Sequence, residues 1–149
     1  MTTEDMTEER RRWLAVLARA PGDELAAAVE GAGAPPCRVV RAAETGLVMV
    51  RGRAGGTGER FNLGEMTVSR CTVTDDEGRL GVGWIAGRDK RKAEAVARLD
   101  LLLQRPEGAL LKARVVAPLA AAQAATREAR AAKAAATKVE FFTMVRGDV

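Results

Sequence analysis

A strand with glycine at alternate positions constrains this chain more than any other feature. On one face of the segment 79–86 lie Leu80, Val82, Trp84 and Ala86, and on the other lie Gly81, Gly83 and Ile85. Such alternation is typical of a β-strand, whose successive side chains point to opposite faces. A glycine face packs poorly as a core but lets another backbone approach closely. We therefore predict that Gly81 and Gly83 lie at a docking interface.

This strand belongs to a longer stretch, Gly55–Lys90, that has a charged glycine corner at each end. Residues 65–73 and 79–86 are predicted to pair as a hairpin around a turn at 75–78. Met66 and Val68 share one face of the first strand, whereas Cys71 and Val73 share the other. A bulge near Arg70 would explain this change of phase.

The first corner contains Gly55, Gly56 and Gly58, followed by Arg60. It is not a Walker A motif, because it lacks the Gly-Lys-Ser/Thr ending. Two interpretations remain. The glycines could expose N–H groups to an anion beside Arg60, or they could simply permit positive φ in a wide hairpin loop. The local spacing favours the second.

The second corner, Gly87-Arg88-Asp89-Lys90, leads into a helix for which Asp89 is a suitable N-cap. Arg88 and Lys90 flank the free N–H groups of that helix, where phosphate or carboxylate can bind. Equally, both cations could be solvated while Asp89 only caps the helix. We take Arg60, Arg88 and Lys90 as candidate contacts to a substrate or a partner.

The absence of histidine excludes several kinds of chemistry from this chain alone. Without histidine there is no Ser–His or Cys–His pair and no histidine metal site, and tyrosine is absent too. Cys37 and Cys71 lack CxxC spacing, which favours two buried or half-buried thiols. We assign no catalytic residue, no metal ligand and no cofactor bound by this chain alone.

The net charge of +4 permits binding to anions, including nucleic acid. The arginines are scattered, however, and two tryptophans and three phenylalanines are too few for a base-stacking platform. We therefore expect no nucleic acid as a partner. A small basic nucleic-acid-binding module is kept as the alternative hypothesis. A free-standing phosphate-handling enzyme using Glu59, Asp89 and Lys90 is a third hypothesis.

The first half of the chain predicts two helices followed by two strands. After a loose end at residues 1–6, Thr7 and Asp23 are the expected N-caps of the helices. Strands are predicted at 37–42 and 47–54, separated by a turn at Glu44-Thr45-Gly46. The second strand would bring Arg51 and Arg53 beside Arg60.

The last third predicts a helix after Asp89, an extended or irregular segment at 110–117, and an alanine-rich helix at 119–136. Arg127, Arg130 and Lys133 form a basic face on that helix. The strand-like tail 139–149 carries exposable apolar residues, of which we assign Phe141, Phe142 and Met144 to an interface. Residues 118–149 are expected to dock on partner subunits.

Together these elements predict one α+β domain over residues 1–149, with a small, mostly antiparallel sheet of about four to five strands. No apolar run reaches the roughly 18–20 residues of a membrane span. The polar start lacks the apolar core of a signal peptide. A cytoplasmic protein that makes no membrane contact is the expectation.

Five blocks in register, from residue 10 to the end, resemble the PhnG subunit of the carbon–phosphorus lyase system. They are Arg41–Val48, Gly55–Phe61, Gly87–Lys90, Ala117–Leu119 and Phe141–Asp148. The chain departs from the family at Lys92, where members often carry histidine.

The resemblance implies a non-autonomous subunit of a twofold bacterial core complex with PhnH, PhnI and PhnJ, acting functionally with PhnL. It implies a part in organic phosphonate catabolism, in which ATP and methylphosphonate are the substrates of the complex. The product is α-D-ribose 1-methylphosphonate 5-triphosphate, and adenine is released. The subunit would thus belong to a transferase without being catalytic by itself.

Overall fold

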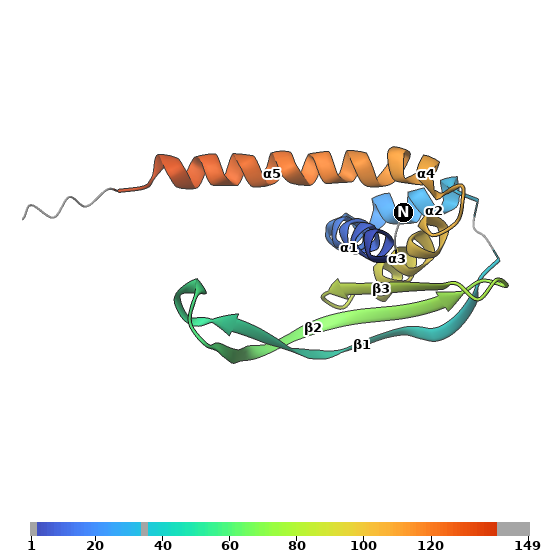
Figure 1. The fold of residues 1–149 in the computed structure, drawn as a ribbon, viewed down its shortest axis with the longest axis horizontal. Coiled ribbons are helices and arrows are strands. Elements are labelled where there is room, and N and C mark those ends of the chain that lie inside the picture. The colour runs from blue at the N-terminus through green and yellow to red at the C-terminus, as the bar shows by residue number, and fades with distance from the viewer. Residues whose placement is uncertain (1–2, 34–35, 140–149) are drawn as a thin grey trace, which may run out of the picture.

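The helices form a layer over one end of a three-stranded sheet, and the rest of the sheet extends beyond them (Figure 1). The computed structural model describes residues 3–33 and 36–139. Within these residues the helices are α1 (Thr3–Arg19), α2 (Gly22–Gly31), α3 (Lys90–Leu103), α4 (Gly108–Leu111) and α5 (Ala117–Ala136), with short helical turns η1 (Ala54–Gly56) and η2 (Lys112–Val116). The strands are β1 (Arg38–Arg53), β2 (Arg60–Thr74) and β3 (Leu80–Ala86). The α+β class is confirmed, with three strands in place of four to five.

The three strands are antiparallel in the order β1-β2-β3. The predicted turn at Glu44-Thr45-Gly46 is wrong, because β1 runs through it and Thr45 pairs with Ser69. The register shifts between Val39 and Arg41 and again between Arg41 and Glu44, each time with an extra residue in β1. Such bulges bend a strand without reversing it, so two expected strands are one.

The predicted bulge near Arg70 is also wrong in its placement. Arg41 pairs with Thr72 and Glu44 with Arg70, so the additional residue belongs to β1. Between β2 and β3 the register is unbroken from Val68 to Thr74. The phase change that suggested a bulge in β2 has another cause. The apolar Val68 lies on the outer face, beside Arg70 and Trp84, and is buried there, whereas Cys71 and Val73 are buried on the inner face.

The glycine face of β3 lies directly under α3. A Cβ at Gly81 would be 2.1 Å from the Ala97 carbonyl oxygen, and one at Gly83 would be 2.0 Å from that of Ala93. The predicted close approach of a backbone is therefore confirmed, but the backbone is the chain's own. This corrects the assignment of Gly81 and Gly83 to an intersubunit interface, because both are buried inside the domain.

The core lies between α1, α2, α3 and the inner face of β2 and β3. Its fully buried side chains are mostly aliphatic, and the largest are Leu17, Leu25, Leu99, Leu101, Val73 and Val96. As predicted, Asp89 caps α3 by accepting a hydrogen bond from the Lys92 N–H at 2.9 Å. Cys71 is buried and Cys37 half-buried, which confirms the expectation of two free thiols.

A buried carboxylate joins three elements of this core. Asp100, on α3, is fully buried and accepts hydrogen bonds from the Arg10 guanidinium at 2.7 Å and from Trp13 Nε1 at 2.8 Å. It also accepts from the Val82 N–H of β3 at 2.9 Å. Because these donors satisfy the charge, Asp100 fixes α1 and β3 against α3 and is not accessible for chemistry.

The first residues of α1 and α2 differ from the predicted ones. α1 begins at Thr3, so Thr7 lies inside the helix and does not cap it. α2 begins at Gly22, with Pro21 in the N-cap position instead of Asp23. Sequence signals place helices better than they place helix ends.

The segment 110–117 is helical, which corrects the extended or irregular prediction. α4 continues through η2, a π-helical turn, into α5. Proline lacks an N–H and its ring clashes with the carbonyl four residues earlier. The wider π turn just before Ala117 and Pro118 fits that requirement and lets the helix continue.

Two segments project from the helical layer in the same direction (Figure 1). One is the distal part of the β1–β2 hairpin, and the other is α5, in which every residue from 125 to 136 is exposed. No helix among the described residues is long and apolar enough to cross a membrane.

Candidate functional site

The hairpin tip contains the first charged corner. Arg53 pairs with Arg60 across the strands and also donates a hydrogen bond to the Gly58 carbonyl at 3.3 Å. Gly55 and Gly56 have φ of 58° and 80°, values that suit glycine. The Gly58 N–H donates to the Ala54 carbonyl at 2.8 Å and so closes the turn. This geometry supports the hairpin-loop interpretation of the glycines over an anion cradle.

Arg88 and Lys90 lie where β3 passes into α3. The turn is fixed by the Gly87 N–H, which donates to the Thr67 carbonyl at 2.9 Å, and by Ser69 Oγ, which donates to the Gly87 carbonyl at 2.9 Å. Both cations are exposed and line an open depression of about 490 Å³, whose other wall is residues 45–47. They are therefore free to meet an anion or a partner.

The structure does not bring the two corners together. Arg60 is seven residues from Thr67 along β2, and Thr67 is the residue that contacts the Gly87 turn. At about 3.4 Å per residue the separation is roughly 24 Å. Arg60 therefore belongs to one surface, and Arg88 with Lys90 to another. The position of Arg53 opposite Arg60 was predicted correctly, whereas Arg51 pairs with Asn62.

A charged cluster on the outer sheet face was missed from the sequence. Glu44 accepts hydrogen bonds from Arg41 at 2.9 Å and from Arg70 at 2.7 Å. The pKa of Glu44 is lowered below its ordinary value, mainly by the hydrogen bond from Arg41 and then by that from Arg70. The Arg70 guanidinium also lies 5.3 Å from the centre of the Trp84 ring, which is 47% exposed. The contact of Glu44 with Arg70 depends on the register between β1 and β2, which local spacing does not reveal.

Exposed apolar side chains lie on both faces of the hairpin, since Leu47 and Met49 point away from the face that carries Glu44 and Arg70. The exposed large ones of β1 and β2 are Val39, Val40, Leu47, Met49, Phe61, Leu63 and Met66. Leu63, the most exposed at 66%, has no partner in the β1–β2 register, since Val50 pairs with Gly64 and Arg51 with Asn62. Exposed large apolar side chains in this number are typical of protein–protein contacts.

The predicted interface residues Phe141, Phe142 and Met144 lie outside the described residues.

Comparison of the amino-acid sequence with known proteins shows the family of this chain. The model of the family described as phosphonate metabolism protein PhnG matches residues 8–147. The chain belongs to the PhnG family. One PhnG relative, from Rhizobium meliloti (strain 1021), is named as the alpha-D-ribose 1-methylphosphonate 5-triphosphate synthase subunit PhnG. It is 45% identical over 144 residues, which cover 94% of this chain and 90% of the relative.

Proposed function

We propose that this chain is a non-autonomous subunit of an α-D-ribose 1-methylphosphonate 5-triphosphate synthase. The observation that carries the proposal is 45% identity, over almost the whole length of both chains, to a protein named as that subunit. The uncovered hairpin and the end of α5 beyond Arg130 support a contribution through assembly, since both present surface that a single copy does not bury.

In this proposal the other subunits are PhnH, PhnI and PhnJ in a cytoplasmic complex, with PhnL acting alongside. ATP and methylphosphonate are the substrates of the complex, and this chain binds no cofactor by itself. Arg60, Arg88 and Lys90 contact the triphosphate or carboxylates of a partner. Their exposure, in two separate places, allows one corner to serve a ligand and the other a subunit.

The direct test is reconstitution of the synthase with and without this chain. Adenine release from ATP and methylphosphonate should require the chain, and the chain alone should release none. Full adenine release by the remaining subunits without it would refute the proposal.

The hairpin surface can be tested in the same system. We expect Leu63→Asp to abolish co-purification with the other subunits, because burial of a carboxylate against an apolar partner surface is costly. The unfolding free energy of the free chain should change little, since Leu63 is 66% exposed. Ala26→Asp, on the exposed side of α2, adds the same charge as a control. Equal co-purification of both variants would show that the hairpin is not an interface.

A further inference from the structure

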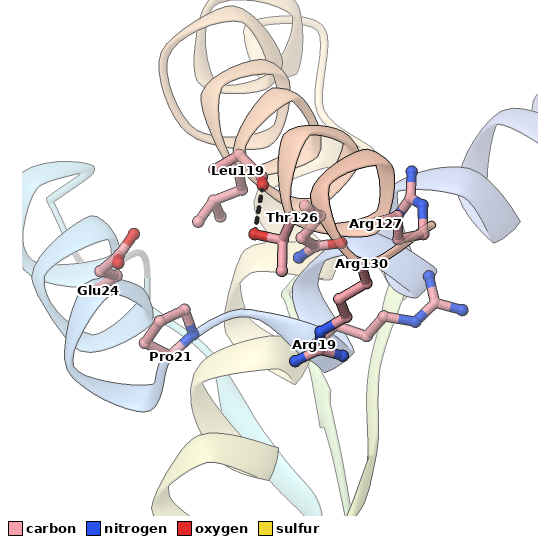
Figure 2. A pocket seen from close by; sticks show the side chains of 9 residues that line it. Arg19, Pro21, Glu24, Leu119, Thr126, Arg127 and Arg130 are labelled. Carbon is pink, nitrogen blue, oxygen red and sulfur yellow. Dashed lines mark hydrogen bonds between the residues drawn. The ribbon is translucent and has the colours of Figure 1, made fainter. Parts of the chain in front are cut away.

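A pocket of about 740 Å³ lies between the α1–α2 corner and α5 (Figure 2). This volume falls within the roughly 300–1,000 Å³ of small-molecule sites. Its apolar part includes Pro21 and Leu119, and its charged part consists mainly of Arg19, Arg127 and Arg130. None of these three arginines was among the candidate site residues from the sequence.

The three arginines come from distant parts of the chain and meet only in the fold. Arg19 ends α1, whereas Arg127 and Arg130 are three residues apart on α5, a rise of about 4.5 Å. Figure 2 shows all three on one side of the pocket, with Glu24 on the opposite side. The position of α5 is fixed by Gln123, whose side-chain amide donates to the Val16 carbonyl at 2.9 Å.

Within the described residues, these guanidinium groups have no hydrogen bond or ion pair. Some other arginines are paired with carboxylates, as in Arg10–Asp100 at 2.7 Å and Arg98–Glu94 at 2.7 Å. What distinguishes the three is that they line one hollow. The hollow is lined by these three positive charges and by one carboxylate, Glu24, so its net charge is positive. The three cations repel one another, and an anion held between them relieves that repulsion. Each guanidinium offers five N–H donors and no acceptor, which suits phosphate oxygens.

We propose that this pocket binds the phosphate chain of a polyphosphate ligand, such as a nucleoside triphosphate or a ribose 5-triphosphate. The inference rests on the proposed function, since the relative's name specifies a 5-triphosphate product. The spread of the three arginines over two helices fits a chain of several phosphate groups better than a single phosphate. Thr126 adds no donor, because its hydroxyl already donates to the Ala122 carbonyl at 2.9 Å.

The first test measures binding of inorganic tripolyphosphate to the full chain by isothermal titration calorimetry. The double substitution Arg127→Ala/Arg130→Ala should weaken binding roughly tenfold or more, through loss of charge-assisted hydrogen bonds. Arg19→Ala should weaken it as well. Alanine favours the helix at these exposed positions, so the double variant should fold, which circular dichroism checks.

The matched control is Arg11→Ala/Arg12→Ala, which removes the same charge from the exposed side of α1. At about 0.15 M salt this control should change the affinity by less than about twofold, because distant exposed charges are screened. Equal weakening by both double variants would reduce the effect to net charge and overturn the site. ATP should bind at least as tightly as tripolyphosphate, and adenosine alone should not bind.

The second test uses the reconstituted synthase and separates this inference from the proposed function. The Arg127→Ala/Arg130→Ala chain should co-purify normally and raise the KM for ATP, with little change in kcat. An unchanged KM in an active complex would overturn the pocket but leave the function intact. Loss of co-purification with unchanged tripolyphosphate binding would make the pocket a subunit contact. Activity that is independent of the wild-type chain would refute the function itself.

Discussion

The contact between β3 and α3 leaves no room for a side chain at Gly83, and Gly83→Ala tests it. An added Cβ would lie 2.0 Å from the Ala93 carbonyl oxygen and 2.9 Å from the Ala97 nitrogen. Both atoms belong to the backbone of α3 and cannot rotate away. The whole helix would have to move by about 1 Å or more, in an interior packed as densely as an organic crystal.

Overpacking of a core typically costs about 1–3 kcal/mol, and a clash with helix backbone places Gly83→Ala near the upper end. A loss of about 3 kcal/mol corresponds to a fall in Tm of roughly 6–12 °C for a chain of this length. Urea unfolding followed by circular dichroism should show a lower midpoint with an unchanged slope.

Gly46→Ala is the matched control, because Gly46 also lies in a strand but an added Cβ there would meet no atom within 4 Å. That substitution should be neutral or stabilising by about 0.4–1 kcal/mol. The reasoning is refuted if Gly83→Ala and Gly46→Ala unfold at the same urea concentration.

Two further predictions concern buried carboxylates. Asp100→Ala should lower the unfolding free energy by about 3–5 kcal/mol, because it removes the ion-pair partner of Arg10 and the acceptor of Trp13 Nε1. A urea midpoint close to that of the wild type would contradict this. For Asp75, burial raises the pKa, but hydrogen bonds from Arg79 and then Arg105 outweigh it and leave the pKa below its ordinary 3.8. Its contribution to stability is therefore complete above pH 3.8 and is lost as the pH falls through the lowered value. Asp75→Asn should flatten the acid limb of the curve of unfolding free energy against pH, and equal acid slopes for both proteins would contradict the assignment.

The elements with strong local signals could be predicted from the sequence. The alternation at 80–86 gave β3, and Asp89 followed by an apolar stripe gave α3. These predictions succeeded because the periodicity of each element is set by its own backbone geometry. The alanine-rich α5 followed in the same way from helix propensity.

The failures came where distant partners decide the outcome. Glu44-Thr45-Gly46 has turn-forming residues, yet pairing with β2 holds it extended. Gly83 signalled a close backbone approach, but the sequence did not reveal that the backbone is α3. The pocket between the α1–α2 corner and α5 likewise depends on the docking of α5 against α1, which no local pattern encodes.

The charged groups that stabilise the fold are different from those exposed at the surface for contact with ligands or partners. Asp75 and Asp100, both buried, accept hydrogen bonds from arginines and backbone N–H groups, so their charge is used within the domain. The basic groups at Arg88, Lys90 and the α5 pocket lie at the surface, where the fold does not require them. Cations that are paired inside the domain would have to leave their carboxylates before they could bind an anion. A subunit that assists a reaction of phosphorylated substrates therefore needs cations that the fold leaves unpaired. The basic groups that the fold leaves free therefore support the proposed assisting role.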